Sequence, residues 1–240
     1  MAVLQEQLGL FGKRRKDRRG GRRPRAGRKR SPTSGHTHRR RPSLNRHTPV
    51  HVTTRLLPRM RNLRARNVYK LVRRAFCFGC DRFGFRIVQY SVQGNHIHLI
   101  CEASDRRALA KGVQAFKVRV ARAMNRMMKR RGAVWADRYH AEQLASPRHV
   151  RNALVYVLNN AKRHAERIHE PRWHERDWVD PCSSAPWFDG WKRECRRWVP
   201  PPEGERPVAP ARTWLLTQGW REHHSLIGTW ENPRGRSKAR

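Results

Sequence analysis

The stretch Gly94-Asn95-His96-Ile97-His98-Leu99-Ile100 places one isoleucine between two histidines, in a run that alternates like a β-strand. Successive side chains of a strand point to opposite faces, so His96 and His98 share one face while Ile97 and Leu99 share the other. The apolar pair predicts a buried face. Two neutral imidazoles side by side can bind one divalent cation. An ordinary half-exposed strand has the same alternation, so the surrounding sequence must decide between these interpretations.

Periodicity and turn signals predict the neighbouring elements. They are a strand over 48–56, a helix over 59–82, a strand over 85–92, the histidine strand over 96–103, a helix between Asp105 and Gly132, a strand over 134–144, and a helix from Pro147 to about residue 167. This order predicts an α+β fold, a ferredoxin-like antiparallel sheet with helices on one face (β-α-β-β-α-β-α). The histidine strand is then central, and the last helix can lie across the face that carries the imidazoles.

The chain divides by composition into three parts. Residues 1–46 are a basic, Gly- and Pro-punctuated tail that we expect to be disordered, and residues 47–168 form the folded domain. Residues 169–240 are an appendage rich in Trp and Pro. Its indoles are expected to dock onto the domain, and stacking on nucleic acid bases is the alternative.

Charge points to a polyanionic partner. The 240 residues include 55 Lys and Arg against 18 Asp and Glu, a formal net charge of +37, which predicts nucleic acid binding. No apolar run approaches the roughly 18 residues of a membrane span, and the first residues lack a signal peptide. Five cysteines do not make a disulfide framework in a chain of this size. We therefore expect a cytoplasmic, DNA-associated protein.

The predicted last helix offers two polar side chains on one face. Tyr156 and Asn160 stand at i and i+4, and Asn152 extends the face by one turn. From periodicity alone, Tyr156 is better explained as an aromatic residue at the edge of the apolar stripe. Asn160 can equally be a solvated polar residue.

Together these segments resemble a known family. Asn95-His96-Ile97-His98-Leu99 and the helical Tyr156-Val157-Leu158-Asn159-Asn160 look like the HUH single-tyrosine transposases, closest to the REP-associated tyrosine transposase branch. The resemblance extends to Pro49-Val50-His51-Val52-Thr53 and Trp135-Ala136-Asp137-Arg138-Tyr139, and covers roughly residues 42 to 170. Branch members often have Asn-Pro where this chain has Asn160-Ala161, which predicts that the helix here is unbroken.

The resemblance implies a nicking and strand-transfer enzyme for single-stranded hairpin DNA. His96, His98 and Asn160 would bind Mg²⁺ or Mn²⁺, and Tyr156 would attack the scissile phosphate to form a covalent 5′-phosphotyrosine bond. Relatives include monomers and dimers, so the oligomeric state stays open. The residues expected to follow the DNA backbone are Arg119, Arg122, Arg138, Lys162 and Arg163.

Three alternatives remain at this stage. The same fold could be a domesticated protein that binds hairpin DNA or RNA without catalysis. A metal-dependent hydrolase without a covalent intermediate would need a base near His96, for which the sequence offers no good candidate. Cys77 and Cys80 form a CxxC pair, but Cys182 and Cys195 are too far apart to complete a zinc site, so we interpret the pair as packing residues.

Overall fold

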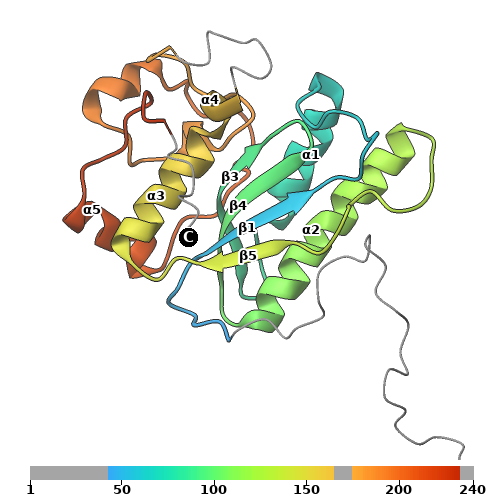
Figure 1. Ribbon diagram of the computed structural model, residues 1–240, viewed down its shortest axis with the longest axis horizontal. Helices are drawn as coiled ribbons and strands as arrows, with labels where there is room; N and C mark the ends of the chain where they lie inside the picture. Colours follow the sequence, from blue (N-terminus) through green and yellow to red (C-terminus); the bar gives the residue numbers. More distant parts are fainter. Residues whose placement is uncertain (1–42, 165–174, 233–240) are drawn as a thin grey trace, which may run out of the picture. The chain divides into compact units, whose positions relative to one another are not determined.

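The computed structural model describes residues 43–164 and 175–232, with a five-stranded antiparallel sheet at the centre (Figure 1). The strands are β1 (Val50–Arg55), β2 (Asp81–Arg82), β3 (Phe85–Val92), β4 (His96–Ala103) and β5 (His140–Gln143), in the spatial order β2-β3-β4-β1-β5. The helices are α1 (Arg66–Gly79), α2 (Arg106–Met127), α3 (Pro147–Leu158), α4 (Asn160–His164) and α5 (Trp220–His223). The predicted α+β class is confirmed.

Strand β4 is central and buried on both faces. Ile97 and Leu99 are wholly buried in the core formed with α1 and α2, while Ile100 belongs to a second core with α3 and α5. Helices α1 and α2 therefore cover one face of the sheet and α3 the other (Figure 1). The two histidines point toward the α3 face, where the sequence pattern placed the last helix.

The structure confirms both predicted helix starts. The Asp105 carboxylate accepts the backbone N–H of Ala108 at 2.7 Å and caps α2. The Ser146 hydroxyl accepts the N–H of His149 at 3.2 Å and caps α3, with Pro147 as its first residue. Each cap satisfies an N–H that a helix start leaves without a partner.

Several predicted boundaries differ from the structure, and strand β2 lies where the end of the helix over 59–82 was predicted. Helix α1 begins at Arg66 rather than 59, because the preceding loop bonds to the sheet: Leu63 donates its N–H to the Gly94 carbonyl at 2.8 Å. Strand β5 covers only His140–Gln143 of the predicted 134–144, while Trp135 forms one isolated bridge with Leu56. The last helix is broken at Asn159, whose φ of −104° and ψ of 15° separate α3 from α4.

Residues 175–232 cover the outer edge of β3, which β2 pairs only at its first two residues. Val92 donates its N–H to the Cys182 carbonyl at 2.9 Å, and Ser184 donates its N–H to the Tyr90 carbonyl at 3.0 Å. Trp220 from the same segment is wholly buried against α3. The segment thus pairs with a strand edge that would otherwise be exposed, and it completes the core between the sheet and α3.

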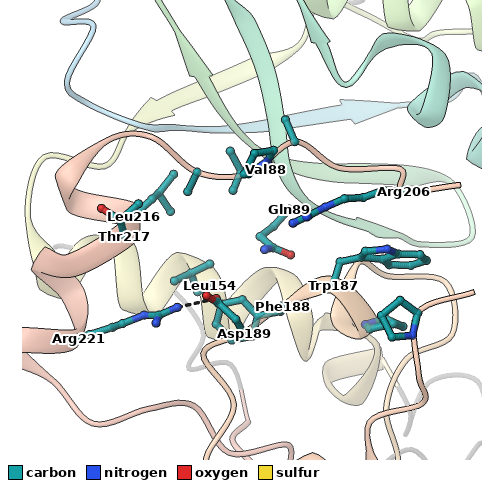
Figure 2. Close-up of a pocket in the computed structure, with 15 residues that line it drawn as sticks. Val88, Gln89, Leu154, Trp187, Phe188, Asp189, Arg206, Leu216, Thr217 and Arg221 are labelled. Atoms are coloured by element: carbon teal, nitrogen blue, oxygen red, sulfur yellow. Dashed lines mark hydrogen bonds and ion pairs between the residues drawn. The ribbon is translucent and has the colours of Figure 1, made fainter.

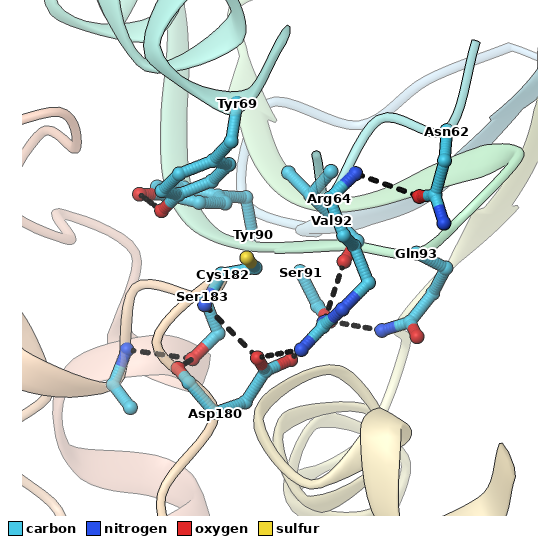
Figure 3. Close-up of polar contacts among 11 residues, drawn as sticks. Asn62, Arg64, Tyr69, Tyr90, Ser91, Val92, Gln93, Asp180, Cys182 and Ser183 are labelled. Carbon is cyan, nitrogen blue, oxygen red and sulfur yellow. Dashed lines mark hydrogen bonds and ion pairs between the residues drawn. The ribbon is translucent and has the colours of Figure 1, made fainter. Parts of the chain in front are cut away.

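A buried ion pair fastens this segment to the sheet. The Arg64 guanidinium donates to both Asp180 oxygens, at 3.0 and 2.8 Å, and to the Val92 carbonyl at 2.9 Å (Figure 3). Burial disfavours the charged guanidinium, but the adjacent Asp180 carboxylate outweighs it, so the pKa of Arg64 is raised. Asp180 also accepts the Cys182 N–H at 2.9 Å. The pair therefore orders the turn that meets β3.

Some predictions fall outside the described residues. The basic tail lies there except for residues 43–46, as does the proposed domain boundary near residue 169. Among the helices that the structure does describe, none has the length and apolar character needed to cross a membrane.

We expect Asp180→Ala to destabilise the protein by about 3–5 kcal/mol, because it removes the carboxylate that pairs with the largely buried Arg64 guanidinium. Asp81→Ala is the matched control: its ion pair with Arg212 spans 3.8 Å between exposed side chains and contributes at most about 1 kcal/mol. Urea unfolding of the two variants measures the difference. Equal, small losses would show that the Arg64–Asp180 pair does not hold the segment in place.

Candidate active site

The two histidines of β4 lie side by side on the face covered by α3. Their ring centroids are 4.8 Å apart and the rings are nearly perpendicular. His96 is partly exposed and its Nδ1 contacts Asn95 Oδ1 at 2.8 Å, whereas His98 is 4% exposed. One imidazole thus lies at the rim of the site and the other at its floor.

Strand β1 adds two residues that the sequence analysis did not assign to the site. Thr53 stands directly opposite His98 in the β1–β4 register, and its Oγ1 lies 3.0 Å from His98 Nδ1. His51 Nε2 lies 3.2 Å from the same nitrogen. Both fix the orientation of the His98 ring. The sequence pattern that could have identified His51 and Thr53 is the alternation Val50-His51-Val52-Thr53. It predicts that both side chains lie on the strand face opposite the valines.

Helix α3 brings Tyr156 to the histidines. The Tyr156 ring centroid is 5.0 Å from that of His98 and 5.6 Å from that of His51, in edge-to-face contacts. The guanidinium of Arg163 lies 5.8 Å from the centre of the Tyr156 ring, and the Arg163 side chain is exposed. The structure therefore groups a tyrosine ring, two imidazoles and one solvent-facing guanidinium.

Asn160 is wholly buried at the start of α4, four residues after Tyr156. Its side-chain oxygen and nitrogen have no hydrogen-bond partner among the described residues. The neighbouring Asn159 is also buried but donates to the Gly228 and Glu231 carbonyls, at 3.1 and 2.9 Å. A buried amide without partners is costly, so the Asn160 oxygen is available as a ligand, whereas the Asn159 side chain is held by the two hydrogen bonds that its nitrogen donates.

The basic residues proposed to contact the DNA backbone differ in burial and in their distance from Tyr156. Lys162 is 1% exposed, and its Nζ donates to the Glu175 carbonyl at 2.7 Å beneath Trp178. Burial lowers the pKa of Lys162 to about 8. The expectation that Lys162 follows a DNA backbone is therefore wrong, because its ammonium group does not reach the surface.

The arginines differ in position. Arg119 and Arg122 lie on α2, on the opposite side of the sheet from Tyr156, so they cannot contact the same phosphate as Arg163. Arg138 is exposed in the loop before β5. Only Arg163 of the predicted DNA-binding residues stands against the tyrosine ring.

Within residues 43–164 and 175–232, no group of three His, Cys, Asp or Glu side chains is arranged to hold a metal ion. A metal here would depend on the two β4 imidazoles and a neutral oxygen such as that of Asn160. Cys77 and Cys80 lie at the end of α1, where burial raises the pKa of both thiols. Their Sγ atoms contact the carbonyls of Glu205 and Cys77.

A cavity of about 740 Å³ lies away from this cluster, between β3, α3 and the C-terminal segment (Figure 2). Trp187 and Phe188 line it together with Arg206, and an ion pair between Arg221 and Asp189 borders it. The tyrosine and the histidines do not line it. The cluster of Tyr156 and the histidines is therefore separate from this cavity.

Comparison with known proteins gives two kinds of likeness. A family model described as "Transposase IS200 like" matches residues 46–160, which contain the histidines, Tyr156 and Asn160. No curated protein matches the sequence. A solved structure of a REP-associated tyrosine transposase bound to a REP hairpin is 15% identical, with a TM-score of 0.50 over 70% of this chain and 93% of that chain.

A second solved structure, described as a transposase from Deinococcus radiodurans R1, is also 15% identical, with a TM-score of 0.35 over 57% of this chain and 98% of that chain. Residues 46–160 match the model of the IS200-like transposases, and the chain has a fold similar to that of a REP-associated tyrosine transposase.

Proposed function

We propose that the protein nicks and rejoins single-stranded hairpin DNA, with Tyr156 as the nucleophile. The observation that carries the proposal is the placement of the Tyr156 ring 5.0 Å from that of His98. His98 and Tyr156 are 58 residues apart in the chain and meet there, on the sheet face that also carries His51 and Thr53. The REP hairpin in the similar solved structure supports hairpin DNA as the substrate.

The nucleophilic attack can be assigned to a residue of this chain. The Tyr156 oxygen forms a bond to phosphorus and its proton passes to water, while the bond from phosphorus to the 3′ oxygen breaks and that oxygen takes a proton from water to give a 3′-OH. The phosphotyrosine bond keeps the energy of the phosphodiester, so a second 3′-OH can be joined without ATP. Since a free tyrosine titrates near pH 10, positioning must supply much of the rate.

The donor set fits a divalent cation. His96 and His98 would supply imidazole nitrogens, and the buried Asn160 amide would supply an oxygen that has no other described partner. The contacts of Thr53 and His51 with His98 Nδ1 resemble those that orient metal-binding histidines. Bound Mg²⁺ or Mn²⁺ would polarise a non-bridging phosphate oxygen.

The remaining roles are recognition roles. Arg163 is exposed beside Tyr156, so we assign it to a phosphate next to the scissile bond. Arg138 is exposed in the loop before β5 and is assigned to a more distant phosphate. Arg46 and the arginines further from the site would add sequence-independent affinity.

We expect a labelled single-stranded hairpin oligonucleotide with Mn²⁺ to form a covalent adduct that survives denaturing electrophoresis. Tyr156→Phe should abolish the adduct, because the phenyl ring keeps the packing and loses the nucleophile. Tyr69→Phe is the matched control, since Tyr69 lies on α1 and hydrogen-bonds Tyr90 on the other side of the sheet. Chelation of the metal should reduce the adduct as strongly as Tyr156→Phe.

A wild-type protein that binds the hairpins tightly and forms no adduct with any of them would favour the non-catalytic hairpin-binding protein. An adduct that persists in Tyr156→Phe would assign the nucleophile elsewhere.

The two adjacent asparagines give a test of the ligand role that does not need activity. Asn159→Ala should lower the free energy of unfolding by about 1–3 kcal/mol, because two buried carbonyls lose their donor. Asn160→Ala should change it by less than about 1 kcal/mol, because no hydrogen bond is lost. Urea unfolding without metal measures both. Equal losses would mean that the Asn160 amide is already satisfied and is not a spare ligand.

A further inference from the structure

The tip of the β2–β3 hairpin carries a phenylalanine that neither packing nor turn geometry explains. Phe83 is 91% exposed and its φ is +52°. Gly84 follows with φ of +73°, so both central residues of this two-residue turn are left-handed, as in a type I′ turn. Asn-Gly and Asp-Gly favour that turn, whereas a bulky aromatic residue there is strained. Phe83 therefore destabilises the isolated protein in two ways: its backbone is in a left-handed conformation, and its apolar ring is exposed to water.

A second exposed ring lies beside the hairpin tip. Phe78, in the last turn of α1, is 58% exposed. The Arg119 guanidinium lies 4.1 Å from the centre of the Phe78 ring and that of Arg82 lies 5.0 Å from it. Arg82 precedes Phe83 in the chain. We call Phe78, Arg82, Phe83 and Arg119 the hairpin-tip patch: two exposed aromatic rings with two guanidinium groups.

The patch is separate from the tyrosine site. In the β3–β4 register Phe85 stands opposite Ala103, whereas the end of β3 at Val92 stands opposite Ile97, next to His96. The hairpin tip and the histidines therefore lie at opposite ends of β4, roughly 20 Å apart at the rise of an extended strand. Arg119 also lies on α2, across the sheet from Tyr156.

We propose that the hairpin-tip patch binds single-stranded DNA, with an unpaired base stacked on Phe83 and phosphates contacting Arg82 and Arg119. Exposed aromatic rings beside cations are the arrangement by which proteins hold unpaired strands, and a duplex offers no free base faces to stack. The proposal goes beyond strand cleavage, because binding here needs neither Tyr156 nor a metal.

A second copy of this chain fits the patch less well. The net charge of +37 opposes association of two copies through arginines. Strand β2 has only two residues, too few to extend the sheet of a neighbour by strand addition. Charge and ring exposure both favour a flexible polyanion with accessible bases.

The test uses the full-length chain with the Tyr156→Phe substitution, so that DNA cleavage by Tyr156 does not contribute. The binding result is then independent of whether the proposed cleavage reaction occurs. Phe83→Asn removes the ring and suits the type I′ turn better, so the variant should be at least as stable to urea. Phe83→Trp keeps a stacking ring. Binding of a labelled single-stranded oligonucleotide and of the matching blunt duplex is measured at high salt, where purely electrostatic binding is suppressed.

We expect Phe83→Asn to weaken binding of the single strand about tenfold, the loss of roughly one stacked base, and to leave duplex binding unchanged. Phe83→Trp should bind the single strand as tightly as the parent. Unchanged single-strand affinity in Phe83→Asn would overturn the proposal, as would an equal loss for both nucleic acids. A parent dimer that Phe83→Asn converts to monomers would instead make the tip an interface between copies, and would overturn it too.

Discussion

Strand β4 must be buried on both faces, and the rest of the structure follows from that requirement. Ile97 and Leu99 need the apolar faces of α1 and α2, while Ile100 needs cover from the other side. Because side chains alternate, the cover over Ile100 also lies over His98. A core-packing constraint thus determines where α3 lies, and α3 carries Tyr156 to the imidazoles.

The C-terminal segment is part of this arrangement. Trp220 and Ile227 pack against α3, and the Arg64–Asp180 pair holds the turn that covers the edge of β3. Asn159 donates to two carbonyls of the same segment, at the break between α3 and α4. That break precedes Asn160, so the segment helps set where the spare amide lies. Arg119 on α2 and Arg163 beside Tyr156 lie on opposite sides of the sheet. This division favours a DNA strand that contacts both sides of the protein.

Local patterns predicted β1, β3, β4, the two helix caps and the face shared by His96 and His98. Long-range contacts determined the rest. The break at Asn159 depends on carbonyls about seventy residues away, and Lys162 is buried because Trp178 and the Glu175 carbonyl enclose it. The sequence around Asn159 and Lys162 gives no indication of these distant contacts. Strand alternation predicts the face on which His51 lies, as it does for His98. The pairing of β1 with β4 is needed to show that His51 contacts His98.

The central claim is that Tyr156 alone reacts with DNA, and mass mapping of the covalent site tests it most directly. The chain has four tyrosines, and the tryptic peptide 152–162 contains only Tyr156. After reaction of the wild-type protein with a single-stranded hairpin and nuclease trimming, the account predicts a nucleotide on this peptide. A nucleotide on a peptide that contains Tyr69, Tyr90 or Tyr139 instead would contradict it.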